Sequence, residues 1–199
     1  MNARRVALCQ TRLQTSTNPI RSNDWVVNVE HKQAAPGALQ APWWRGERGE
    51  WYVIAQVFIF ALIVVGPRTA AGWPAWSGMA AAIATVAGVV LMIAGAALSV
   101  AGVLRLGANL TPLPYPKDCA ELVDTGAYSL VRHPIYSGLI IGGFGWALWV
   151  HGWLTLGYAL GLFVFFDVKS RLEERWLAEK FPGYPAYRKR VKKLIPWVY

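Results

Sequence analysis

Four runs of apolar residues follow one another in the chain after residue 50, at 51–66, 79–104, 135–150 and 154–168. A helix that crosses the hydrocarbon core of a bilayer, about 30 Å thick, needs roughly 17 to 25 residues. The second run is longer than that. The other three have about 16 residues, or about 24 Å at 1.5 Å per residue, so each must use interfacial aromatic side chains to span or dip in without crossing. The pattern predicts an all-α fold, a polytopic membrane helical bundle of about four transmembrane helices.

Small residues within these runs predict how the helices pack. Gly88, Gly95 and Gly102 repeat every seven residues in the second run, which is typical of a helix face that lets another backbone approach closely. The third and fourth runs are separated only by a short turn containing Gly152, so they are predicted to form an antiparallel hairpin.

The tail before the first apolar run and the connector between the second and third runs are predicted to lie on the same side of the membrane. Residues 1–48 are polar and lack periodicity, which indicates a poorly ordered tail preceding a membrane-embedded domain at 49–199. The connector between residues 105 and 134 contains Pro112, Pro114 and Pro116, which favour an extended course over a helix.

The C-terminal segment is predicted to form an amphipathic cap. One helix should run from Asp167 through Lys180 and be broken at Pro182. A second helix from Pro185 should place apolar residues on one face and basic residues on the other, as in a cytoplasmic cap lying on the membrane surface. The predicted apolar face consists of Tyr184, Tyr187, Val191, Leu194 and Ile195.

Composition and charge support a membrane protein. The 199 residues are 55% hydrophobic and include 11 Trp, which excludes an ordinary soluble domain. If all four runs cross, every Lys and Arg except Arg68 lies on the same side, so the positive-inside rule predicts cytoplasmic termini and an external turn at 151–153. We interpret the net charge of +9 as a consequence of this topology and as a source of attraction to anionic membrane lipid. The predicted location is the bacterial inner membrane.

Other partner classes find no support in the residue pattern. Basic and aromatic residues do not interleave as in proteins that bind single strands, so no nucleic-acid partner is expected. The two Cys and three His residues have no ligand spacing, so no metal site is expected. The oligomeric state stays open.

A first polar cluster, Arg132 and His133 followed by Pro134, stands immediately before the third run. Proline suits the first position of a helix, and the free N–H groups of such a helix attract anions. The alternative is that Arg132 is an anchor stretching to water and His133 a helix-end polar residue.

A second polar cluster, which contains Glu173 and Glu174, follows the end of the fourth apolar run. Glu173 and Glu174 either form a solvated helix face paired with basic neighbours, or hold a cationic ligand such as a sulfonium or ammonium group. In the second case Tyr128 and Tyr136 would add aromatic ring faces to the cation.

Linked motifs across residues 80–199 carry a specific resemblance. The runs LVDTGAY at 122–128 and VRHPIYSG at 131–138 precede the Glu pair, and are followed by Leu177, Phe181, Gly183, Tyr184, Tyr187, Ile195 and Pro196. In this order they resemble the isoprenylcysteine carboxyl methyltransferase family and its bacterial phospholipid-methyltransferase-like relatives. The resemblance implies an integral membrane enzyme that uses S-adenosylmethionine to methylate a lipophilic small molecule or lipid through a carboxylate, thiol or headgroup.

The resemblance also implies roles for individual residues. Glu173 would hold the amino group of the cofactor, and the other cofactor-binding residues would be Ala120, Glu121, Leu122, Val123, Tyr128, His133, Pro134, Ile135 and Tyr136. In the family an Arg one helical turn before the acidic pair helps hold the substrate carboxylate. This chain has Lys169 there and Arg171 two residues later, and both are assigned to substrate binding.

Catalytic roles are assigned to Arg132, His133 and Glu174. An ionised carboxylate or thiolate acceptor needs only alignment, whereas an amine or hydroxyl acceptor needs a base, for which His133 and Glu174 are the candidates. Two other classes stay open: an NADPH-dependent membrane ene or sterol reductase, whose C-terminal half is similar, and a non-catalytic membrane scaffold.

Overall fold

The computed structural model describes residues 50–111, 120–196 and 198–199, all within one compact unit. The predicted tail and the three connector prolines lie outside the described residues. The described part contains no strand, only one isolated bridge between Val131 and Lys192, so the all-α prediction is confirmed for it. The helices are α2 (Glu50–Val65), α3 (Gly78–Leu106), η2 (Gly107–Asn109), α4 (Ala127–Leu130), α5 (Pro134–Trp149), α6 (Trp153–Lys180) and α7 (Tyr184–Arg190).

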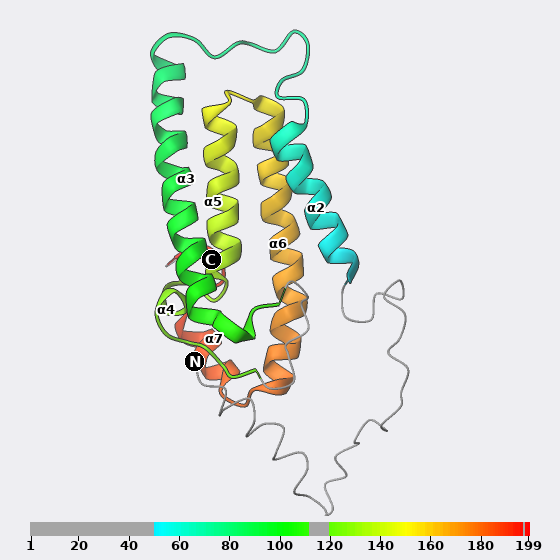
Figure 1. Ribbon diagram of the computed structural model, residues 1–199, viewed down its shortest axis with the longest axis vertical. Helices are drawn as coiled ribbons and strands as arrows, with labels where there is room; N and C mark the ends of the chain where they lie inside the picture. The colour runs from blue at the N-terminus through cyan, green and yellow to red at the C-terminus, as the bar shows by residue number, and fades with distance from the viewer. Residues whose placement is uncertain (1–49, 112–119, 197) are drawn as a thin grey trace, which may run out of the picture. The chain divides into compact units, whose positions relative to one another are not determined.

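Four of these helices stand side by side in the order α3, α5, α6, α2 (Figure 1). The helices α5 and α6 form the predicted antiparallel hairpin, joined by a turn at 150–152. Apolar side chains from α2, α5, α6 and the C-terminal segment meet in a core that contains Ile63, Ile140, Leu162, Phe166 and Leu194. The short helices α4 and α7 lie together at one end of the bundle (Figure 1).

Within the described residues, two helices are long and apolar enough to cross a membrane: the segment 78–109, which comprises α3 and η2, and α6. The helices α2 and α5 have 16 residues each and are shorter than a typical span. The helix α6 is continuous over 28 residues, so the fourth apolar run and the helix predicted after Asp167 form one element. At 1.5 Å per residue it is about 42 Å long, which exceeds a hydrocarbon core by about 12 Å.

The glycine repeat of α3 packs closely against another helix, as predicted, and that helix is α5. A Cβ atom added at Gly88 would lie 2.6 Å from the carbonyl oxygen of Gly145, and one added at Gly95 would lie 2.5 Å from that of Gly138. These distances leave no room for a side chain. Glycines on both helices therefore let the two backbones touch, which fixes the start of α5 against the end of α3.

The C-terminal segment differs from its prediction. The helix α7 ends at Arg190, and Val191 has extended backbone angles. The amide of Arg132 donates to the Lys192 carbonyl at 2.8 Å, and the amide of His133 donates to that of Lys193 at 3.2 Å. The prediction that one helix continues through Leu194 and Ile195 is therefore wrong. The chain leaves the helical conformation because its backbone pairs with residues 132–133.

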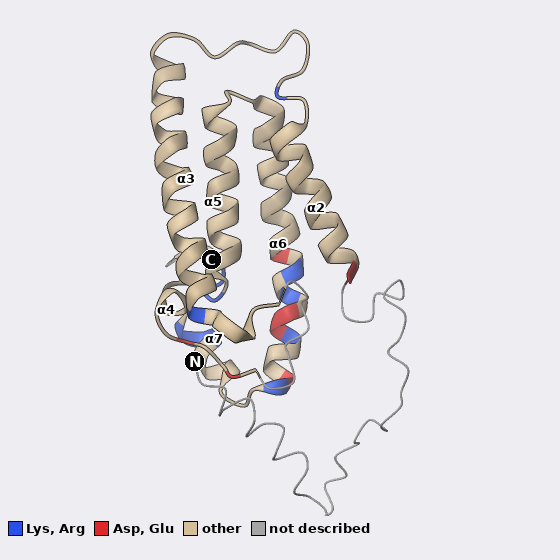
Figure 2. Cartoon of the chain, in the orientation of Figure 1, with Lys and Arg blue, Asp and Glu red and all other residues tan. Residues whose placement is uncertain are grey.

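Charged residues gather at the end of the bundle that holds α4, α7 and the last turns of α6 (Figure 2). The opposite end carries Arg68, in the connection between α2 and α3. The predicted orientation in the membrane depends on this unequal distribution of charge between the two ends. The orientation itself stays a prediction.

Candidate functional site

A cavity of about 300 Å³ lies at the charged end of the bundle. It is lined by the end of α3, by residues 120–123, and by parts of α2, α4, α5, α6 and α7. The lining brings together most of the predicted site residues: Ala120, Glu121, Leu122, Val123, Tyr128, Arg132, His133, Ile135, Tyr136, Lys169 and Glu173. Pro134, Arg171 and Glu174 do not line it.

His133 is held by the beginning of α5. It caps the helix with φ −127° and ψ 65°, and Pro134 occupies the first helical position as predicted. The Ser137 hydroxyl donates to the carbonyl oxygens of His133, at 3.0 Å, and of Leu194, at 2.7 Å. The backbone of His133 is therefore held from its own helix and from the C-terminal segment, and only 6% of the residue is exposed.

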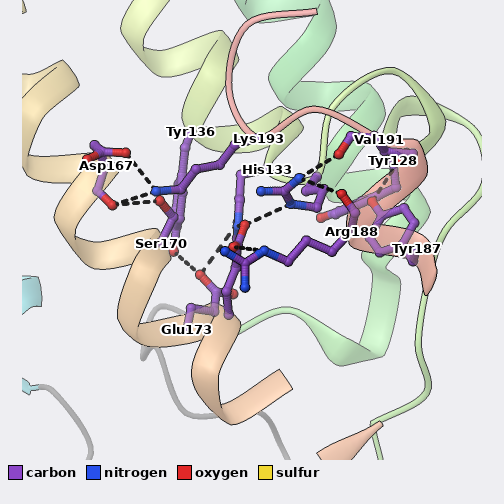
Figure 3. Close-up of polar contacts among 12 residues, drawn as sticks. Tyr128, His133, Tyr136, Asp167, Ser170, Glu173, Tyr187, Arg188, Val191 and Lys193 are labelled. Carbon is purple, nitrogen blue, oxygen red and sulfur yellow. Dashed lines mark hydrogen bonds and ion pairs between the residues drawn. The ribbon is translucent and has the colours of Figure 1, made fainter. Parts of the chain in front are cut away.

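Glu173 presents a carboxylate to the cavity. It accepts a hydrogen bond from the Tyr136 hydroxyl at 3.0 Å, and its Oε2 lies 3.7 Å from Nδ1 of His133 (Figure 3). The rings of His133 and Tyr136 stack with centroids 5.4 Å apart. Because 25% of the Glu173 side chain is exposed, its carboxylate retains lone pairs that can accept hydrogen bonds from a ligand.

Glu174 lies about 100° around the helix from Glu173, since an α-helix has 3.6 residues per turn, and it contacts the other ring nitrogen of His133. Its Oε1 accepts from Nε of Arg132 at 2.8 Å and lies 3.2 Å from Nε2 of His133. Its side chain is 5% exposed. Arg132 also donates to the carbonyl oxygens of Val191, at 2.5 Å, and Arg188, at 3.2 Å. Glu174 thus orients His133 from behind, and its catalytic assignment stays a prediction.

Lys169 is the buried cation of the cavity, with 1% of the residue exposed. Its Nζ donates to Oε1 of Gln56 in α2 at 2.8 Å and lies 5.3 Å from the Tyr136 ring centroid. Sequence reasoning missed Gln56, although a single amide in an apolar run was an available signal. Arg171 instead pairs with Asp167 at 2.7 Å and is 65% exposed, away from the cavity.

The aromatic wall comes from α4 and α7. Gly126, with φ +66°, allows the turn into α4 that brings in Tyr128. Burial and the nearby Glu173 carboxylate raise the pKa of Tyr128, so its ring stays neutral. The Tyr187 hydroxyl donates to the Tyr128 carbonyl at 2.7 Å. Leu177, Phe181 and Tyr184 also line this side and were part of the motif, without an assigned contact.

Another part of the wall is a short strip, residues 120–123, which lies outside the helices. Nδ2 of Asn109 donates to the Glu121 carbonyl at 3.1 Å, which ties residues 120–123 to the end of α3. The strip is thereby placed on the same cavity as His133, although the two are separated by about ten residues in the chain.

Fold and site together define a helical membrane protein with a ligand cavity at one end of its bundle. The sequence profile of the family described as phospholipid methyltransferase matches residues 83–183, just over half of the chain. The chain therefore belongs to the phospholipid methyltransferase family, a family of membrane methyltransferases.

Individual relatives include a metal-resistance protein and a methyltransferase. The chain is 28% identical to the nickel-cobalt-cadmium resistance protein NccN of Alcaligenes xylosoxydans xylosoxydans over 82% of its own length and 70% of that protein. It is 37% identical to the protein-S-isoprenylcysteine O-methyltransferase of Schizosaccharomyces pombe, over 39% of its own length and 34% of that enzyme. It therefore spans about a third of that enzyme's length.

A solved structure shares the fold. The eukaryotic intramembrane Ras methyltransferase ICMT superposes with a TM-score of 0.53 at 23% sequence identity, over 75% of this chain and 53% of that one.

Proposed function

We propose that this protein is an integral membrane methyltransferase that uses S-adenosylmethionine and acts on a lipophilic acceptor. The observation that carries the proposal is the Glu173 carboxylate, which is open to a cavity whose lining includes the aromatic side chains of Tyr128 and Tyr136. The Tyr136 ring stacks on His133 and Phe166, and its hydroxyl donates to Glu173. A carboxylate and an aromatic wall are suited to a ligand with ammonium and sulfonium groups. The volume of about 300 Å³ is that of a small-molecule site.

The chain's own residues would bind and orient. Glu173 would accept from the ligand amino group, and residues 120–123 would offer backbone groups beside it. The methyl group would be supplied by the sulfonium of the cofactor. His133, held by Glu174, would fix the position of Tyr136 through ring stacking, and the buried setting would exclude water from the acceptor.

Lys169 favours an anionic acceptor. A buried ammonium beside the cavity stabilises a carboxylate or thiolate, and such an acceptor needs alignment but no base. The apolar part of the cavity lining includes Leu106 of α3 and Leu139 of α5, which suits a hydrocarbon substituent. An acceptor with an oily body and an anionic head fits both features.

The test is methyl transfer from methyl-labelled S-adenosylmethionine to three lipophilic acceptors that differ only in bearing a carboxylic acid, a thiol or an amine. We expect label in the acid or the thiol, and we expect Lys169→Gln to raise the KM for the acceptor while leaving cofactor affinity unchanged. Arg171→Gln, exposed and off the cavity, is the matched control. Label in the amine alone would contradict the proposal that the acceptor is anionic. Binding of NADPH in place of S-adenosylmethionine would contradict the assignment of the protein as a methyltransferase.

We also propose that the protein lies in the bacterial inner membrane with both termini in the cytoplasm. The concentration of Lys and Arg at the site end of the bundle supports this orientation. It would open the cavity toward the compartment that contains the polar cofactor.

A further inference from the structure

A second cavity, of about 490 Å³, lies behind the pair formed by Arg132 and Glu174. Arg132 lines both cavities, so this one begins where the first ends. Its lining contains a single acidic side chain, that of Glu174, and six basic side chains: Arg132, Arg171, Arg175, Arg188, Lys192 and Lys193.

Part of this positive charge is already compensated. Glu174 pairs with Arg132 at 2.8 Å, and Asp167 pairs with both Lys193, at 2.6 Å, and Arg171, at 2.7 Å. Figure 3 shows Lys193 reaching across to Asp167.

The remaining basic groups of the cavity are poorly compensated. Arg175 and Lys192 are exposed and form no ion pair with any residue that the structure describes. The contact of Arg188 with Glu174 is long, at 3.5 Å, and its side chain is 61% exposed. A concave surface with two or three unbalanced cations attracts an anion.

The position of the cavity along α6 suggests which anion. If a hydrocarbon core of about 30 Å begins near Trp153, it ends about 20 residues later, close to residue 173. Arg171 and Arg175 then lie at the level of the lipid headgroups. Val198, which is 72% exposed, lines the same cavity and adds an apolar contact beside the cations.

We propose that this cavity binds the phosphate group of an anionic lipid headgroup. Arginine presents a planar fork of donors that matches phosphate oxygens, and Arg175 and Arg188 provide two such forks here. The bound headgroup would lie one side chain from the ligand cavity, because Glu174 contacts both Arg188 and His133. This site is separate from the cofactor and acceptor sites.

The test measures lipid binding to the full chain, without methyl transfer, so that it is independent of the proposed activity. The parent is placed in nanodiscs of phosphatidylcholine with increasing phosphatidylglycerol, and the melting temperature is followed as the binding signal. The double variant Arg175→Gln/Lys192→Gln removes the two cavity cations that lack ion pairs. Lys180→Gln/Lys189→Gln removes the same charge from α6 and α7 outside the cavity lining and is the control.

We expect the cavity variant to need roughly ten- to thirtyfold more phosphatidylglycerol for half of the stabilisation, since each basic residue near an anionic surface contributes about fivefold. The control variant should shift much less. Equal shifts in the two variants would overturn the proposal, because they would indicate diffuse attraction to a charged surface. Equal stabilisation by glycerol phosphate in discs of pure phosphatidylcholine would overturn the assignment to a lipid headgroup.

Discussion

Replacing the two adjacent carboxylates one at a time should separate ligand binding from stability. Glu173 lines the cavity and is 25% exposed, so Glu173→Gln removes the charge that faces a cationic ligand. The amide oxygen can still accept from the Tyr136 hydroxyl, so folding should be little affected. A hydrogen bond to a charged group contributes about 1.5 to 3 kcal/mol, so affinity for S-adenosylmethionine should fall roughly ten- to a hundredfold.

Glu174→Gln should mainly lower the stability of the protein and have little effect on cofactor affinity. The carboxylate does not line the ligand cavity, is 5% exposed, and compensates the Arg132 guanidinium. The amide leaves that buried cation with only neutral acceptors, including the carbonyl oxygens of Val191 and Arg188. A loss of about 1.5 to 3 kcal/mol would lower the melting temperature by roughly 3 to 12 °C. Affinity for the cofactor should fall only a few-fold, through looser placement of His133.

Calorimetric titration with S-adenosylmethionine and thermal unfolding by circular dichroism, both on purified protein in detergent, measure the two quantities. The reasoning fails if Glu173→Gln binds the cofactor like the parent. It also fails if Glu174→Gln keeps the parental melting temperature and loses binding, because that result would make Glu174 the ligand contact.

Three further changes test the site, the helix packing and the topology. His133→Ala should remain folded but lose the thermal stabilisation that S-adenosylmethionine gives the parent, since a ligand stabilises only the state that binds it; an undiminished shift would remove His133 from the site. Gly95→Ala should destabilise by about 1 to 3 kcal/mol, because the new methyl group would lie 2.5 Å from the Gly138 carbonyl, whereas Gly157→Ala, with open space around it, should not; equal melting temperatures would contradict the close packing. In a protein whose natural cysteines are replaced by serine, Ala71→Cys, exposed between α2 and α3, should react with an impermeant maleimide in intact cells; protection in intact cells with labelling in inverted vesicles would reverse the topology.

The sequence alone determined the features that depend on neighbouring residues. The starts of α2, α3, α5 and α6 fall within one residue of the apolar runs, because a stretch without charge has no alternative to a hydrogen-bonded helix in lipid. The repeat of Gly88, Gly95 and Gly102 indicated a close helix contact before its partner was known. The linked motifs likewise contained most of the residues that line the cavity.

The tertiary structure decided which member of each pair faces the cavity. The chemistry of Glu173 and Glu174 does not distinguish them, although the family resemblance assigned them different roles. The packing of α6 against α5 turns Glu173 toward the cavity and Glu174 toward Arg132. The same is true of Lys169, which is buried beside Gln56 of a helix more than a hundred residues earlier, and of Arg171, which is turned away. Local patterns specify where a helix begins and which residues share a face, but the direction in which that face points depends on contacts between segments that are distant in the chain.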